Sequence, residues 1–366
     1  MKREYITVLI LIIFSIFLSC ERKQQITSKI MTEGEIEQFV GGEIDQKEEI
    51  AQKEFDFLKQ NQQVHIVGGS EGNAVYWLNG KMTVLPKERE DNAGAKAIAV
   101  SGSDVHIAGY EIKHFEGSYV RTDAVYWLNG IKIILPCEFT DPRPTAITVS
   151  GSNVHIVGRA GAEAVYWLNG VQILLPKTAP QGRSSFAWAM ATGITISGSD
   201  VYIIGTDCDN AVYWLNGIEV VLPSSGKHPG AIATGIVISG SDVYIVGRDG
   251  LDAVYWRNEI RTVLYAGTES PYSIGTAEAV TVSDSNIYIT GFAGSNIVYW
   301  LNWVMSKPLF FEPSYEKVNV RPNSIAVLDS DVFVVGEDGD DAVLWLNGNR
   351  IVLSDDSWAS AIFVTR

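Results

Sequence analysis

Short apolar runs repeat along most of the chain, separated by small or polar residues. The clearest example predicts strands over 191–197, 200–205, 211–217 and 218–223, all rich in Val, Ile, Tyr and Trp. Glycine, serine, asparagine and proline bound these runs. The runs do not alternate strictly between apolar and polar positions, so we expect sheets that are buried on both faces.

The same four-run phrase occurs seven times and typically contains the letters AVYWLNG. Its tryptophan falls at Trp77, Trp127, Trp167, Trp214, Trp256, Trp300 and Trp345, at spacings of 50, 40, 47, 42, 44 and 45 residues. Repeats of about 40–50 residues with four strands each are typical of propeller blades. The predicted fold class is therefore all-β, a seven-bladed β-propeller with four-stranded blades.

The turns fall into two sets. The connection between the third and fourth strands is usually Asn-Gly, a strong signal for a two-residue hairpin turn, although Asn258-Glu259 and Asn302-Trp303 depart from it. The connections after the second and fourth strands vary in length and chemistry. In an up-and-down blade these variable connections share one face, so we expect a variable-loop face opposite a face of tight turns. The largest variable connection is Glu111 to Asp123.

The two ends of the repeat region complement each other. The first repeat starts at Gln63 without an inner strand, and residues 359–366 resemble an inner strand without a blade. We therefore expect the C-terminal strand to join the first blade and close the ring, which leaves no exposed end-to-end edge.

The N-terminus predicts export and anchoring. A basic start and a 12-residue apolar run over 7–18, too short to span a membrane, precede Ser19-Cys20. This arrangement resembles the bacterial lipobox, although Phe17 stands where leucine is usual. The resemblance implies a signal peptide over 1–19, an acylated Cys20 and a polar tether over 20–61. The alternatives are an ordinary signal peptide or a signal anchor.

The repeats over 62–366 resemble those of bacterial propeller-repeat lipoproteins, which are built from VYIVG, AVYWLNG and VLP units. This resemblance implies the fold and a location in the cell envelope, lipid-anchored at an outer membrane or cell surface. It implies no particular activity. The net charge of −15 should repel nucleic acids, so a cation, a basic protein or a neutral glycan is a better partner.

Two groups of residues invite a metal hypothesis. His65, His106 and His155 occupy a second-strand position that holds Tyr or Phe in the other blades, so we interpret it as aromatic packing. Asp338, Asp340 and Asp341 surround a glycine and suit Ca²⁺, although they lack the spacing of an EF-hand. No other cofactor is predicted. Cys137 and Cys208 fall two blades apart and are expected to be unpaired thiols.

Aromatic residues collect in the variable connections, where they suit contacts with sugars or proteins. The alternative is that these loops fold back and pack on the blades. The candidates are Phe115, Trp188, Tyr272, Tyr315 and Trp358. No catalytic motif is present. The leading hypothesis is a non-catalytic binding or scaffold module for a protein or glycan of the envelope. The alternatives are an enzyme that acts on envelope polysaccharide, a glycosidase or lyase, and a structural subunit of an envelope complex.

Overall fold

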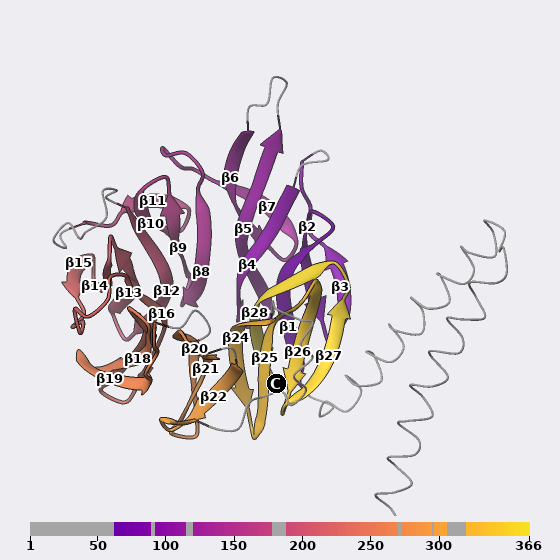
Figure 1. Cartoon of the computed structure of the whole chain (residues 1–366). Coiled ribbons are helices and arrows are strands. Elements are labelled where there is room, and N and C mark those ends of the chain that lie inside the picture. The colour runs from indigo at the N-terminus through magenta and orange to yellow at the C-terminus, as the bar shows by residue number, and fades with distance from the viewer. Residues whose placement is uncertain are drawn as a thin grey trace, which may run out of the picture. The chain divides into compact units, whose positions relative to one another are not determined.

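Each repeat forms a four-stranded antiparallel sheet, and the seven sheets are arranged in a ring around a common axis (Figure 1). The computed structural model describes residues 62–88, 92–114, 120–177, 188–269, 273–294, 296–305 and 320–366. The predicted seven-bladed β-propeller is confirmed. Within these residues, no helix is long and apolar enough to cross a membrane.

The strands follow one another from this axis outwards in every blade. Blade 1 contains β28 (Ser357–Thr365), β1 (Gln63–Ser70), β2 (Asn73–Leu78) and β3 (Lys81–Val84). Blade 2 contains β4 (Asn92–Ser101), β5 (Asp104–His114), β6 (Val120–Leu128) and β7 (Ile131–Leu135). Blade 3 contains β8 (Arg143–Ser150), β9 (Asn153–Ala160), β10 (Glu163–Leu168) and β11 (Val171–Leu174).

The remaining blades repeat this order. Blade 4 contains β12 (Ala189–Ser197), β13 (Asp200–Asp207), β14 (Asn210–Leu215) and β15 (Ile218–Val221). Blade 5 contains β16 (Ala231–Ser239), β17 (Asp242–Asp249), β18 (Asp252–Arg257) and β19 (Ile260–Tyr265). Blade 6 contains β20 (Gly275–Ser283), β21 (Asn286–Ala293), β22 (Asn296–Leu301) and β23 (Val304–Met305). Blade 7 contains β24 (Val320–Leu328), β25 (Asp331–Asp338), β26 (Asp341–Leu346) and β27 (Asn349–Ser354).

The C-terminal strand closes the ring as predicted. β28 pairs antiparallel with β1 from Gln63 opposite Thr365 to Ser70 opposite Ser357. Blade 1 is thus a composite sheet, because its innermost strand comes from the opposite end of the chain. Strand β28 begins two residues earlier than the sequence indicates, and it therefore includes Trp358.

The insertion in blade 2 differs from the prediction. Glu111 to Asp123 was expected to be a loop, but β5 continues to His114 and β6 starts at Val120, and the two strands remain paired there. An ion pair from Lys113 to Asp123 at 2.8 Å joins the extended parts of β5 and β6. Lys113 also pairs with Glu88, in the connection before β4, at 2.8 Å. The candidate Phe115 lies outside the described residues.

Asparagine joins the two tight turns of each blade. The side-chain oxygen of the turn asparagine accepts a hydrogen bond from the backbone near the start of the second strand. The donors are Val64, Val105, Val154, Val201, Val243, Ile287 and Val332, at 2.8–3.0 Å. The asparagines have φ of 48–52°, as a type I′ turn requires.

Blades 5 and 6 keep the same turn without its glycine. Glu259 and Trp303 have φ of +67° and +73°, a strained conformation for such side chains. Each side chain instead contacts the preceding blade. The Tyr213 hydroxyl donates to Glu259 at 2.6 Å, and the Trp303 ring stacks on Tyr255 with centroids 3.9 Å apart. These contacts help to offset the strain.

The seven blade tryptophans fill the spaces between neighbouring blades, and each is at most 1% exposed. The indole N–H of Trp127 donates to the carbonyl oxygen of Pro86 in the preceding blade at 2.9 Å. Trp167, Trp214 and Trp256 make the same bond to the preceding blade at 2.7–2.8 Å. Proline also ends the outer strand, because it has no N–H for the sheet.

At two joints of the described residues the bond is missing and the preceding blade lacks this proline. Tyr265 and Ser354 take its place in blades 5 and 7, where the outer strands run on through a β-bulge. Accordingly, the indole nitrogens of Trp300 and Trp77 have no hydrogen-bond partner among the described residues. The protein therefore contains two kinds of inter-blade contact that share the same buried ring.

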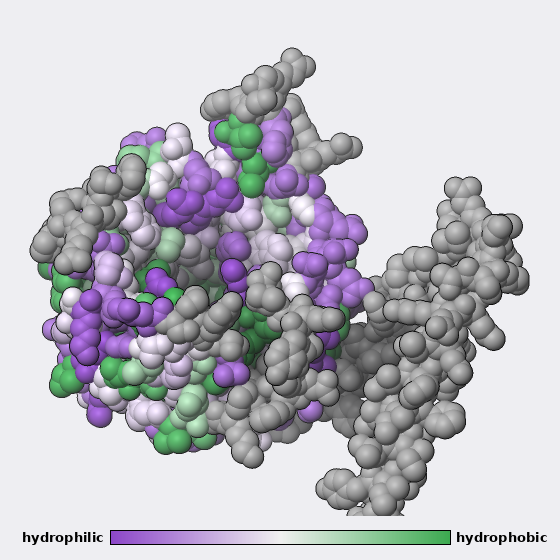
Figure 2. Space-filling model, in the orientation of Figure 1, coloured by the Kyte–Doolittle hydropathy of each residue, from purple (hydrophilic) through white to green (hydrophobic). Residues whose placement is uncertain are grey.

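Many outer-strand side chains are apolar and exposed. Ile131, Val171, Ile218, Ile260 and Val304 are 65–71% exposed and occupy the same position in five consecutive blades. On the face shown in Figure 2, hydrophobic residues lie scattered among hydrophilic ones. The outer strands therefore contribute little to the core, which lies between the blades.

A comparison of two tryptophans tests the indole–proline bond. We expect Trp127→Phe to lower the free energy of unfolding by about 1–2 kcal/mol more than Trp300→Phe, because only the first leaves a carbonyl oxygen without its donor. Both changes remove a similar apolar area, so Trp300→Phe is the matched control. Equilibrium urea unfolding measures the difference, and equal losses would contradict the role of the bond.

Candidate functional site: the central channel and its mouth

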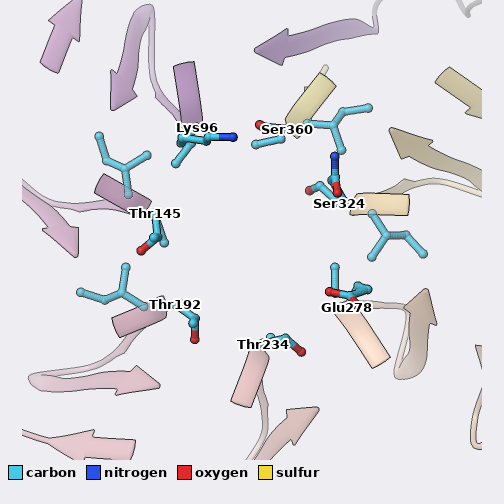
Figure 3. A pocket seen from close by; sticks show the side chains of 18 of the residues that line it. Lys96, Thr145, Thr192, Thr234, Glu278, Ser324 and Ser360 are labelled. Atoms are coloured by element: carbon cyan, nitrogen blue, oxygen red, sulfur yellow. The ribbon is translucent and has the colours of Figure 1, made fainter. Parts of the chain in front are cut away.

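Every inner strand carries one β-bulge at the same height. A bulge adds one unpaired residue, and here its side chain lines the channel. We call these seven residues the channel ring: Lys96, Thr145, Thr192, Thr234, Glu278, Asn323 and Ser360. Figure 3 shows six of them around a single opening, whose volume is about 240 Å³.

Four members of the channel ring hold neighbouring blades together. Thr145 donates to the carbonyl oxygen of Ala191 in the next blade at 2.7 Å. Thr192 and Thr234 repeat this bond at 2.6 and 2.5 Å, and Asn323 repeats it at 2.8 Å. In each case the acceptor precedes the next ring residue. A neutral donor at the bulge therefore links adjacent inner strands.

Lys96 and Glu278 are the charged members of the ring. The Lys96 ammonium lies 3.9 Å from the centroid of the Trp358 ring, a cation–π contact between blades 2 and 1. Burial lowers the pKa of Lys96, whereas Glu337 opposes this shift. Burial raises the pKa of Glu278, although the positive charges of Arg248 and Arg321 act in the other direction.

The channel mouth lies between the channel ring and the variable-loop face. Each inner strand runs from the variable-loop face to the tight turns, and the inner-strand residues of the mouth come two positions before the bulge. We define it by Tyr110, Arg143, Arg248, Arg321, Glu337 and Trp358, together with Lys96 from the ring. The Arg143 guanidinium lies 4.1 Å from the centroid of the Tyr110 ring and pairs with Asp141 at 2.8 Å. Asp141 also pairs with Arg159 at 3.0 Å.

Trp358 is the predicted candidate that the structure brings into this cluster. Its indole packs against the backbone of Gly69 and Gly94, where an added Cβ would lie only 2.5 and 2.9 Å from the ring. Only glycine fits at these two positions, so the indole is held in one orientation beneath Lys96. Trp358 is a rigid part of the mouth.

The other aromatic candidates are not gathered with it. Trp188 stands directly before β12 and is 37% exposed. Tyr272 and Tyr315, like Phe115, lie outside the described residues. Sequence reasoning missed Lys96, Arg143, Arg248 and Arg321. A sequence signal for Lys96 and the other ring residues was available. Each inner strand consists mostly of small and apolar residues, and a polar residue stands at the ring position.

The candidate calcium residues of blade 7 contact an arginine. Arg350 pairs with Asp338 at 2.5 Å and with Asp341 at 2.8 Å, while Asp340 lies in the turn between their strands. Blade 5 repeats the arrangement with Arg261 between Asp249 and Asp252. In the part of the chain that the structure describes, no group of three His, Cys, Asp or Glu side chains is placed to hold a metal. Ca²⁺ binding stays a prediction.

The three second-strand histidines pack as expected. Each is 3–6% exposed, and its Nδ1 lies 2.7 Å from the hydroxyl of a tyrosine in the third strand. The pairs are His65 with Tyr76, His106 with Tyr126 and His155 with Tyr166. Burial lowers the pKa of all three imidazoles. The cysteines Cys137 and Cys208 form no disulfide with each other.

These histidines predict a loss of stability in acid. Their pKa values in the folded protein lie below the usual 6.5, so as the pH falls below 6.5 the unfolded chain binds protons first. Stability is therefore retained above pH 6.5 and decreases below it. Urea unfolding at pH 7.5, 6.5 and 5.5 measures this slope.

Blade 7 provides the control for this experiment. It carries Phe333 and Leu344 where blade 3 has His155 and Tyr166. The double variant His155→Phe with Tyr166→Leu should flatten the slope between pH 6.5 and 5.5. An unchanged slope would show that the imidazoles do not cause it.

Comparisons with known proteins show no family for this chain. No family model and no curated protein matches the chain. Among solved structures, apo AztD from Citrobacter koseri is 12% identical with a TM-score of 0.46, over 83% of this chain and 98% of that one. The computationally designed protein Ika8 is 15% identical with a TM-score of 0.45, over 83% and 90%. A Trypanosoma rangeli sialidase mutant displaying trans-sialidase activity is 10% identical with a TM-score of 0.39, over 78% and 65%.

Proposed function

We propose that this β-propeller is a membrane-anchored lipoprotein that acts as a non-catalytic binding or scaffold module through its variable-loop face. The partner is a protein or glycan of the cell envelope. The observation that carries this proposal is the channel mouth, where Trp358 and Tyr110 are each covered by a cation at about 4 Å. Fixed aromatic rings with adjacent cations are common in binding sites, because little entropy is lost when a partner binds.

The neighbouring carboxylates favour binding over catalysis. Asp249 and Asp338 each lie in an ion pair with an arginine of the same blade, and Asp141 holds Arg143 and Arg159. Such pairs orient these carboxylates towards protein groups. These ion pairs make the variable-loop face rigid, as a scaffold requires.

One observation favours the alternative, an enzyme that acts on envelope polysaccharide. Burial raises the pKa of Glu278, as is typical of a general acid in a glycosidase. That mechanism also needs a second carboxylate as a base or nucleophile. Glu337 is a candidate in the mouth, and it accepts a hydrogen bond from the amide of Asn323 at 3.4 Å.

Anchoring is the first part of the proposal to test. Cys20 lies outside the described residues, and its lipobox-like setting is the support for acylation. We expect Cys20→Ser to move the protein from the membrane fraction to the soluble fraction, because acyl chains supply about 0.8 kcal/mol of membrane affinity per buried CH₂. Cell fractionation and immunoblotting measure this, with Cys137→Ser as the control that stays in the membrane. A membrane-bound Cys20→Ser protein would argue against the lipid anchor.

Partner capture tests the binding face. In crosslinked pull-downs from the envelope, we expect Trp188→Ala with Tyr272→Ala to reduce the captured partner at least tenfold. The control is Ile218→Ser, which changes a 70% exposed residue on an outer strand. Equal capture by all three proteins, or equal loss in the control, would refute the assignment of this face.

A further inference from the structure

We propose that the channel mouth binds a small hydroxylated carboxylate, whose anionic group is recognised by Lys96, Arg143 and Arg321. This inference rests on the proposed binding function and names the ligand class of the same site. It follows from the charge of the mouth, the hydrogen bonds of its side chains and the size of the channel.

The mouth concentrates positive charge in an acidic protein. The chain as a whole carries a net charge of −15. Yet Lys96 lines the opening, Arg143 acts electrostatically on Lys96, and Arg248 and Arg321 act on Glu278. The acids of this cluster are Glu278, Glu337 and Asp141, and Asp141 is already paired with Arg143 and Arg159. A local cationic site within a negative surface selects small anions, since a polyanion is repelled by the remaining surface.

Two arginines of the mouth, Arg248 and Arg321, differ from the paired arginines of the blades. On the blades, Arg261 and Arg350 each contact two aspartates at 2.5–3.0 Å. By contrast, Arg248 and Arg321 form no ion pair with any residue that the structure describes, although both act electrostatically on Glu278. The Nε of Arg248 is buried without a hydrogen-bond partner among those residues. Buried donors are normally satisfied, so this one indicates a missing acceptor.

Lys96 extends from its strand towards Ser360 of the neighbouring blade (Figure 3). The Trp358 ring contacts its ammonium group on one side, and an aromatic ring accepts no conventional hydrogen bond. An ammonium group has three donors, and burial has removed much of its water. A carboxylate oxygen would compensate for this desolvation.

The hydroxyls of the ring favour a hydroxylated ligand body. Thr145, Thr192 and Thr234 use their protons on backbone carbonyls, which leaves oxygen lone pairs as acceptors facing the channel. Glu278 adds its carboxyl oxygens to the same level, and burial raises the pKa of that carboxyl. The ring therefore presents several oxygen acceptors below the cations.

The channel limits the ligand to a small molecule. The volume of the channel is about 240 Å³. Two residues after the ring position along each inner strand, an aliphatic side chain from every blade lines the channel. These residues are Ile98, Ile147, Ile194, Ile236, Val280, Ile325 and Ile362. A hydroxylated ligand gains nothing by entering this apolar level, so it should remain at the mouth and ring.

Thermal unfolding of the full-length protein tests the proposal with three anions and one neutral sugar. We expect millimolar glucuronate or citrate to raise the melting temperature by at least 2 °C, whereas glucose leaves it unchanged because it lacks the carboxylate. The increase should fall by at least three quarters in Lys96→Met and in Arg321→Gln. Arg350→Gln, which alters a paired arginine on blade 7, should respond like the parent protein.

Several outcomes would overturn the inference. They are no response to either carboxylate, a response to inorganic phosphate alone, an equal response to glucose, or a full response in both mouth variants. Circular dichroism of the unliganded variants checks that each has folded, and either variant suffices for the comparison. If no anion binds while Trp188 and Tyr272 still govern partner capture, this inference fails and the proposed function stands.

Discussion

The packing of one buried tryptophan from each blade against the preceding blade is the constraint on which this structure depends. A single four-stranded sheet cannot bury the indole, since the apolar clusters lie between blades. The chain must therefore form a closed ring, and closure needs β28 beside β1. The central channel is a consequence of this closure, because seven inner strands then surround a common axis.

Much of the fold could be predicted because its determinants are local and repeated. The regular spacing of Trp77 to Trp345 fixed the number of blades, and Asn-Gly located the tight turns. The prediction was wrong for the blade 2 insertion, where residues 111–114 and 120–123 extend the hairpin. Polar residues such as Lys113 suggested a loop, but Lys113 pairs with Asp123 across the two strands, so its charge is compatible with a sheet.

The site was harder to predict because it is assembled from residues far apart in the sequence. Trp358 was selected as an aromatic residue near the mouth, whereas its partner Lys96 lies in an ordinary-looking inner strand more than 250 residues away. The bulges that turn Lys96 and Glu278 into the channel depend on pairing between strands. No local sequence pattern predicts such a bulge, so the channel ring could be identified only in the tertiary structure.

The replacement of proline by Tyr265 and Ser354 makes the joints of the ring unequal. Two of the joints lack the indole–carbonyl bond, and one of them is reinforced by the stacking of Trp303 on Tyr255. The joint between blades 7 and 1 has no such stack among the described residues, although the chain itself runs across it into β28. Local opening of the propeller under heat or force should therefore begin at this joint, next to the composite blade in which β28 pairs with β1.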